Sequence, residues 1–307
     1  MPPAAPPKKW TTRSLLDWMS GAFTSKGLDS PRLCAEMLLA HVLGCDRLKL
    51  YTDPDRPAAE QERAALRDLT QRALNHEPVQ YLTGVAWFFS MRFKADARAL
   101  IPRPCTELIV EHVLQHARLV PPSSEAGASS GPVIADVCTG GGCIAVALAK
   151  HLKSARVIAC DVSAEALTLA RENAELHRVA DRLDFLQGDL LAPVLDHPVG
   201  SRLNYLVSNP PYIPDDEWND PEMMGKNVKG HEPELALRAG PDALRLVRPL
   251  IAQGPQRLLP GGLLMIELAT QSAAAALALA QENPLLDSPR ILKDHEGLDR
   301  VLLARRR

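Results

Sequence analysis

The tetrapeptide Asn-Pro-Pro-Tyr at residues 209–212 follows a short apolar run and combines residue types that could hold a planar amino group. The prolines Pro210 and Pro211 fix φ and remove two backbone donors, so the chain must leave a strand there. The Asn209 side-chain carbonyl and the Pro210 backbone carbonyl then offer two acceptors for a carboxamide or for the exocyclic amine of adenine or cytosine. Tyr212 would supply a flat apolar wall. A rigid turn alone explains the prolines but not the Asn or the Tyr. We therefore predict these four residues to be catalytic.

Glycine-rich and acidic residues follow three other short apolar runs. The first run ends at Asp136 and leads into Cys-Thr-Gly-Gly-Gly at 138–142, a turn that lets the backbone approach a ligand ahead of a helix N-terminus. Glycines also serve tight strand-to-helix turns that bind nothing, so this turn alone leaves both interpretations open.

Acidic residues at the ends of the next two runs favour a nucleoside ligand. Asp161 could accept hydrogen bonds from both ribose hydroxyls, or it could merely begin a turn that helps Ser163 to cap the next helix. Asp189 could accept from an adenine amino group while Leu190 covers a ring face, although Asp after Gly is common in turns. The complete Gly-x-Gly-x-x-Gly fingerprint of dinucleotide sites is absent, which favours adenosine joined to a group without phosphates. The predicted cofactor-binding residues are Asp136, Cys138, Thr139, Gly140, Gly141, Gly142, Asp161, Asp189, Leu190 and Asn209.

The elements that must position these residues alternate between strand and helix. Apolar strand-like runs occur at 132–137, 155–160, 182–187, 203–208 and 262–268, and helix-like segments at 143–152, 164–176 and 243–258. Such alternation predicts an α/β fold with a mostly parallel sheet covered by helices on both faces. Ligands on these sheets bind at the carboxyl ends of the strands, where the candidate residues lie.

The first part of the chain has a different residue pattern, which predicts helices from residue 11 to about 77. The clearest helix lies in 29–44, where Ser30 is placed to cap it, Pro31 takes the first helical position and Gly44 ends it. Aromatic and branched residues in 79–104 then predict two short strands that form a hairpin. A helix is expected from about Thr106, followed by a surface loop at 121–132.

Composition excludes several classes of protein. The chain has 307 residues, 46% of them hydrophobic, and no apolar run long enough to span a membrane. The N-terminus lacks a secretory apolar segment, so we expect a soluble, cytoplasmic protein with no membrane partner. A formal net charge of −2 gives no chain-wide attraction to nucleic acid. The six cysteines show no zinc-like spacing, so no metal site is predicted.

Together these motifs resemble the S-adenosyl-L-methionine-dependent methyltransferases that carry Asp-x-Gly-x-Gly-x-Gly after the first strand and Asn-Pro-Pro-Tyr after the fourth. Here the first motif reads Asp-Val-Cys-Thr-Gly-Gly-Gly, with Cys138 in place of the usual first glycine. Over nearly the full chain the sequence resembles the release factor glutamine methyltransferases of the HemK/PrmC type. The segments that carry this resemblance are SPRLCAEMLLAHVLG, IPRPCTELIVE, SNPPYI, HEPELAL, GPDALRLVRPLI and HEGLDRVLLAR.

The resemblance implies a Rossmann-like domain with a mostly parallel seven-stranded sheet, and S-adenosyl-L-methionine as cofactor. It implies methylation of N5 of the glutamine in the Gly-Gly-Gln loop of class-one peptide chain release factors. Separately, we expect a monomer that does not bind nucleic acid directly. We expect a helical substrate-recognition domain at 1–77, a hairpin linker at 78–100 and the methyltransferase domain at 101–307.

Three alternatives remain open from the sequence. The glutamine could belong to a large-subunit ribosomal protein, because a sister family shares Asn-Pro-Pro-Tyr. The tetrapeptide would equally suit N6 of adenine in nucleic acid, which would require a basic track beside an unstacked base. A non-catalytic assembly factor that binds S-adenosyl-L-methionine would leave Asn209 without a purpose.

Overall fold

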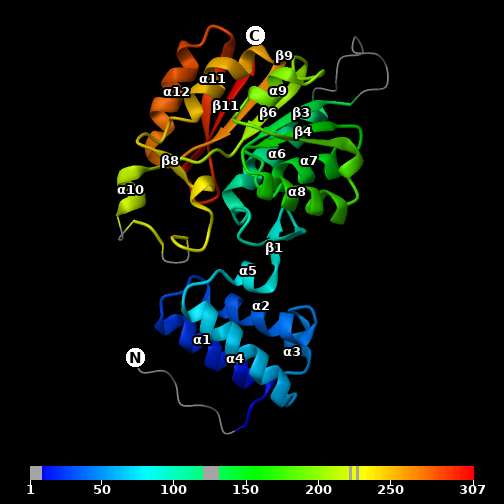
Figure 1. The fold of residues 1–307 in the computed structure, drawn as a ribbon, viewed down its shortest axis with the longest axis vertical. Coiled ribbons are helices and arrows are strands. Elements are labelled where there is room, and N and C mark those ends of the chain that lie inside the picture. Colours follow the sequence, from blue (N-terminus) through cyan, green and yellow to red (C-terminus); the bar gives the residue numbers. More distant parts are fainter. Residues whose placement is uncertain (1–8, 120–130, 221–222, 226–227) are drawn as a thin grey trace. The chain divides into compact units, whose positions relative to one another are not determined.

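The computed structural model describes residues 9–119, 131–220, 223–225 and 228–307. The chain forms two compact units, one comprising residues 1–85 with 226–231 and the other residues 86–225 with 232–307 (Figure 1). The loop expected at 121–132 lies almost entirely outside the described residues. None of the helices in the described ranges has the length and apolar character needed to cross a membrane.

The first unit is helical, as the sequence predicts. Its helices are α1 (Thr12–Ser25), α2 (Pro31–Leu43), α3 (Lys49–Thr52), α4 (Glu60–Leu74) and α5 (Val79–Thr83). Their apolar faces share one core that includes Leu16, Phe23, Leu38 and Leu66. Burial of these side chains is what holds such short helices together, because isolated helices of this length are marginal in water.

The start of α2 differs from the prediction in one respect. Pro31 does occupy the first turn, and Gly44 ends the helix in the left-handed region at φ 59°. Ser30 stands at the N-cap position, but its φ of 49° is left-handed and its side chain makes no capping hydrogen bond. The expected cap is therefore wrong, because a serine oxygen reaches the first-turn N–H groups from an extended backbone.

The second unit contains a seven-stranded, mostly parallel sheet, which confirms the predicted α/β fold. Its strands are β3 (Val133–Val137), β4 (Arg156–Asp161), β5 (Leu183–Gln187), β6 (Leu203–Ser208), β9 (Leu258–Glu267), β10 (Leu286–Lys293) and β11 (Asp299–Arg306). Their order across the sheet is β10-β11-β9-β6-β3-β4-β5. Neighbours from β9 to β5 run parallel, while β11 pairs antiparallel with both β9 and β10.

Helices cover both faces of this sheet (Figure 1). One core packs α6 (Glu107–Leu119), α7 (Cys143–His151) and α8 (Ala164–Leu176) against one face. The opposite core holds α9 (Ala192–Asp196), α11 (Val247–Gln253) and α12 (Ala273–Glu282). Successive residues of β4 alternate between the two cores, as the two-residue period of a strand requires. This sandwich fixes the strand ends that carry the candidate residues.

The remaining elements are short. The predicted hairpin is present as β1 (Val85–Phe88) and β2 (Met91–Lys94), and β7 (Ile213–Pro214) pairs with β8 (Arg238–Gly240). The other short elements are α10 (Asp215–Asn219) and the 3-10 turns η1 (Pro104–Thr106), η2 (Ala180–Arg182), η3 (Glu234–Ala236), η4 (Gly254–Gln256) and η5 (Thr270–Ser272). The helix expected at 243–258 is shorter than predicted, because Gly254 and Pro255 break it into α11 and η4.

Candidate active site at the carboxyl ends of the parallel strands

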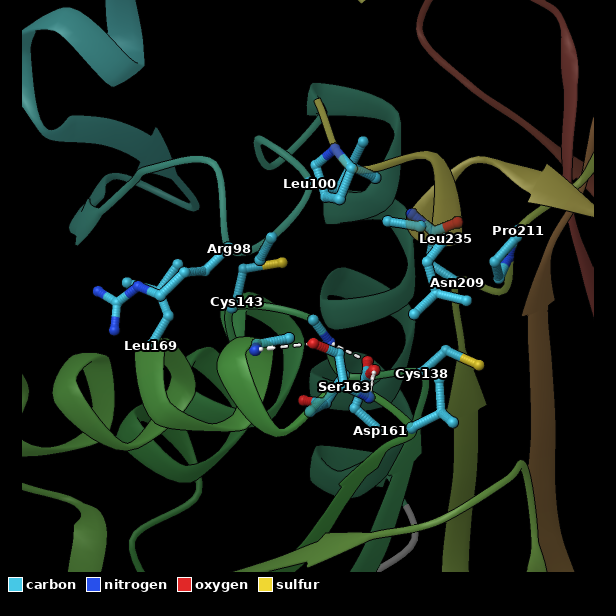
Figure 2. A pocket seen from close by; sticks show the side chains of 18 of the residues that line it. Arg98, Leu100, Cys138, Cys143, Asp161, Ser163, Leu169, Asn209, Pro211 and Leu235 are labelled. Atoms are coloured by element: carbon cyan, nitrogen blue, oxygen red, sulfur yellow. Dashed lines mark hydrogen bonds between the residues drawn. The ribbon is translucent and has the colours of Figure 1, made fainter. Parts of the chain in front are cut away.

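A cavity of about 230 Å³ opens at the carboxyl ends of β3, β4, β5 and β6. Figure 2 shows Asp161 and Ser163 at its lower end and Asn209 with Pro211 at one side. Of the predicted residues, eight cofactor candidates and Pro211 line it: Cys138, Thr139, Gly140, Gly141, Asp161, Asp189, Leu190, Asn209 and Pro211. Most of the predicted residues therefore lie together at the carboxyl ends of the strands, as the sequence predicts. Their roles toward a ligand stay predictions.

Asp136 lies beneath the glycine turn rather than in the cavity wall. Its side chain is fully buried, and Oδ2 accepts hydrogen bonds from Thr139 Oγ1 at 2.7 Å and from the backbone N–H of Ala145 at 3.1 Å. The other oxygen, Oδ1, has no hydrogen-bond partner among the described residues. Burial raises the pKa of Asp136 to about 7. Asp136 thus holds the turn to the start of α7.

Gly140 and Gly142 need the left-handed backbone that glycine tolerates. Their φ values are 56° and 81°. A Cβ on Gly142 would lie 3.0 Å from the Ala170 Cβ, so this glycine allows close packing of the turn on α8. A Cβ on Gly140 would meet no protein atom within 4 Å. Because Gly140 lines the cavity, that added atom would take space where a ligand could sit.

Cys138 also adopts a left-handed backbone, at φ 60°. This conformation explains why glycine is the usual residue at this position of the motif, and a non-glycine residue there costs roughly 1–2 kcal/mol. Burial raises the pKa of the Cys138 thiol well above its usual range, so the side chain stays a neutral thiol. Cysteine in place of the usual glycine therefore leaves the turn intact but adds backbone strain at residue 138.

Asp161 serves the local fold and also faces the cavity. Its Oδ2 accepts from the backbone N–H of Gly140 at 2.8 Å, and its Oδ1 accepts from that of Ser163 at 2.9 Å. Ser163 in turn caps α8 by accepting from the N–H of Ala166. Burial raises the pKa of Asp161, although these two backbone hydrogen bonds oppose the shift. The turn role considered from sequence is present, and each oxygen keeps a lone pair for a ligand.

Asp189 and Leu190 follow β5 and complete this end of the cavity. Leu190 stands in the left-handed region at φ 44°. Gly188 before them has no room for a side chain, because a Cβ there would lie 2.5 Å from Pro193 Cγ. Packing thus requires the glycine, whereas the binding role of Asp189 stays a prediction.

Asn209 begins the coil directly after β6. Its Nδ2 donates a hydrogen bond to Thr106 Oγ1 at 3.2 Å, and its Oδ1 accepts none within the described part of the chain. Pro210 is buried, and neither Pro210 nor Tyr212 is among the residues that line the cavity. Burial raises the pKa of Tyr212, with the nearby Glu267 adding to the shift. The predicted role of Tyr212 as a wall stays a prediction.

A second set of residues around this cavity was not among the predicted site residues. The Glu232 side chain is fully buried, accepts from the backbone N–H of Ile101 at 3.1 Å and pairs with Arg103 at 2.5 Å. This contact ties the loop that carries Leu235 to the segment before α6, and both segments line the cavity. The residues are far apart in sequence, and only the segments IPRP and HEPELAL, quoted for the resemblance, pointed to them.

The arrangement suits transfer of a small group between two bound molecules. Acidic and glycine residues at the ends of β3, β4 and β5 line the cavity together with Asn209, whose amide nitrogen is engaged by Thr106. Arg98, which also lines the cavity, is neutralised by ion pairs with Asp96 and Glu172. No cluster of three His, Cys, Asp or Glu side chains in the described ranges could hold a metal ion.

Comparison with known proteins connects this geometry to a reaction. Residues 14–84 match the family model of the PrmC N-terminal domain, and residues 116–224 match that of the methyltransferase small domain. The chain is 41% identical over 295 residues to a release factor glutamine methyltransferase of Chlorobaculum tepidum, an alignment that covers 96% of this chain and 97% of the relative. The relative of the same name in Geobacter sulfurreducens is 38% identical over 296 residues, with 96% and 97% coverage. That in Rhodopirellula baltica is 36% identical over 293 residues, with 95% of each chain covered.

Proposed function

The chain belongs to the family of release factor glutamine methyltransferases, and we propose that it methylates N5 of the glutamine in the Gly-Gly-Gln loop of class-one release factors. The observation that carries this proposal is the orientation of Asn209. Its amide nitrogen is engaged by Thr106, so its oxygen is left to accept an N–H from a substrate amide. A carboxamide nitrogen carries the two hydrogens that such a site can bind.

The residues present fit S-adenosyl-L-methionine as the methyl donor. When bound, this cofactor supplies an electrophilic methyl group on a positively charged sulfur. Asp161 would accept hydrogen bonds from the ribose hydroxyls with its remaining lone pairs. Gly140 leaves open space in the cavity, where any side chain would intrude. Asp189 and Leu190 would hold the adenine.

The chain's own groups address the main difficulty of the reaction. A carboxamide nitrogen is a poor nucleophile because its lone pair is delocalised into the carbonyl. We infer that Asn209 Oδ1 and the Pro210 carbonyl accept its two N–H groups, which fixes the nitrogen's orientation and stabilises the positive charge that develops there. Positioning and electrostatics then do most of the work. The new N–C bond would form as the S–C bond of the methyl donor breaks, and the surplus proton on the nitrogen would pass to water. Glu232 is not needed as a base, since Arg103 and the Ile101 N–H already engage it.

Mass spectrometry of a purified release factor incubated with this protein and S-adenosyl-L-methionine tests the function. We expect one added methyl group on the loop glutamine, and none on a variant in which that glutamine is alanine. Absence of methylation in both the unaltered release factor and its alanine variant would contradict the proposal. Incubation with ribosomal proteins and with adenine-containing nucleic acid in the same experiment would then identify which alternative substrate is used.

A further inference from the structure

Helix α8 carries a buried asparagine to which the proposed mechanism assigns no part. Asn173 is 1% exposed, and it lines the cavity beside the glycine turn at 140–142. We propose that Asn173 is a positioning residue for the methyl donor, which holds this turn in one conformation before the cofactor binds. The inference rests on the cofactor named in the proposed function and does not depend on the methyl acceptor.

The Asn173 amide spends its oxygen and both of its hydrogens on backbone groups. Its Oδ1 accepts from the N–H of Lys94 at 2.7 Å, and its Nδ2 donates to the Lys94 carbonyl at 3.2 Å. Nδ2 also donates to the Gly141 carbonyl at 2.9 Å. A backbone N–H can only donate and a carbonyl can only accept, so these partners require an amide in this one orientation. The three hydrogen bonds join the end of β2 and the glycine turn to α8.

The bond to Gly141 fixes one peptide group of the turn at both ends. The Gly141 carbonyl and the Gly142 N–H belong to the same planar peptide unit. The carbonyl accepts from Asn173, and the N–H donates to the Thr139 carbonyl at 2.9 Å. Glycine loses more conformational freedom on ordering than any other residue. A glycine turn that is ordered in advance therefore lowers the entropy cost of binding the cofactor, which raises its affinity.

The link to the turn is what Asn173 adds, because other contacts already attach the segment at 94–99 to α8. Glu172 pairs with Arg98 at 2.8 Å and with Lys94 at 3.2 Å. A small apolar cluster adds to this attachment and consists of Ala99, Ala166 and Leu169. Figure 2 shows Arg98 and Leu169 at the same side of the cavity. Loss of the Asn173 amide should therefore loosen the glycine turn and leave the segment in place.

The test compares substitutions of Asn173 with a matched asparagine far from the cavity. In Asn173→Asp an ionised carboxylate can still accept from the Lys94 N–H but has no hydrogen for the Gly141 carbonyl. Asn173→Ala removes the donor without adding a charge. Asn204→Ala is the control, because Asn204 Oδ1 likewise accepts from a backbone N–H, that of Val133 at 2.9 Å. That contact lies near the amino ends of β6 and β3, whereas the cavity lies at their carboxyl ends.

Calorimetric titration with S-adenosyl-L-methionine, at a temperature where each variant is folded, gives the cofactor affinity. We expect both Asn173 variants to lower this affinity by about tenfold, the size of one hydrogen bond. The affinity of Asn204→Ala should stay within about twofold of wild type, although its melting temperature falls. KM for the cofactor should rise in the Asn173 variants, while KM for the release factor stays nearly unchanged. Unchanged cofactor affinity in both Asn173 variants, or an equal loss in Asn204→Ala, would overturn the proposal.

Hydrogen exchange at the Gly142 amide tests the positioning directly and begins with the wild type. We expect this amide to be protected before any cofactor is added, because both ends of its peptide group are bound. In Asn173→Ala it should exchange about tenfold faster or more, and saturating cofactor should restore much of the protection. Exchange in the free wild type at the rate of an unstructured peptide would overturn the proposal even if no variant folds.

The outcomes for Asn173 and for the proposed function can be told apart, because neither calorimetry nor exchange needs a methyl acceptor. A wild type that binds S-adenosyl-L-methionine but does not methylate the release factor would contradict the proposed substrate alone. A wild type that does not bind this cofactor would contradict both. Cofactor binding that is unaffected by the Asn173 substitutions would contradict this inference alone.

Discussion

At the scale of single residues, Asn209 has two different ends, and each has a separate task. Its nitrogen is bound by Thr106 and its oxygen is free for the substrate. The tetrapeptide alone predicted an acceptor role for this oxygen, and that role stays a prediction. The contact with Thr106 could not be predicted with it, because Thr106 comes from a distant segment and reaches Asn209 only in the folded chain.

Removal of the Asn209 amide should affect turnover rather than cofactor binding. We expect Asn209→Ala to lower kcat by roughly a hundredfold or more, the loss that accompanies removal of one preorganised polar group. Calorimetric titration should show nearly unchanged affinity for S-adenosyl-L-methionine, because Asp161 and the glycine turn are untouched. Retention of most of the activity would contradict the role assigned to Asn209.

Asp136 should make the fold less stable as the pH rises. Burial raises its pKa to about 7, whereas an Asp in the unfolded chain has a pKa near ~3.9. The folded state therefore binds more protons between these values, and the contribution of Asp136 to stability is present at low pH and lost as the pH rises through about 7. Denaturant unfolding should be measured between about pH 4.5 and about pH 7.5. The free energy of unfolding of Asp136→Asn should depend less on pH than that of wild type. An identical slope in both proteins would contradict this.

At the scale of elements, the parallel strands were predictable and the last two strands were not. The inner strands each carry a short buried apolar run followed by polar or glycine residues, which gives a clear signal. In β11, Val301 to Ala304 are all buried, so the strand shows no alternation, and β10 contains Pro289 in a half-exposed stretch. α5 was also missed, because only five residues separate Pro78 from Gly84.

The turn between β3 and α7 offers a matched pair of substitutions. Gly142→Ala places a Cβ 3.0 Å from Ala170 Cβ, whereas Gly140→Ala places it in open cavity space. Both carry a left-handed strain of about 1 kcal/mol or more. We expect Gly142→Ala to lose more thermal stability, because α8 must move to make room. Gly140→Ala should lose more cofactor affinity relative to its loss of stability.

Thermal unfolding with and without S-adenosyl-L-methionine measures both effects on these two variants. The cofactor should raise the melting temperature of Gly142→Ala almost as far as that of wild type at saturation, and that of Gly140→Ala by much less. The reverse order would show that Gly140 does not face the cofactor.

At the scale of the whole molecule, the chain forms two units whose boundary in sequence lies at residue 85, while the predicted domain bounds at residues 77 and 100 stay predictions. α5 packs with the other helices of the first unit, through Val79 and Leu82, which extends that unit past the predicted boundary. The hairpin begins directly after it. The roles of the predicted domains stay predictions, and the proposed function gives the first unit a specific task.

A glutamine within a protein loop leaves most of the release factor outside the cavity of about 230 Å³. We therefore expect the first unit to bind the release factor away from its loop. Removal of residues 1–84, which takes away the helices of the first unit and keeps all of β1, should raise KM for the release factor by about tenfold or more, because the second contact is lost. KM for a short Gly-Gly-Gln peptide should change by less than about twofold, since the peptide makes no such contact. Circular dichroism and cofactor titration must first show that the remainder is folded. Equal increases for protein and peptide would mean that the first unit supports the catalytic unit rather than the substrate.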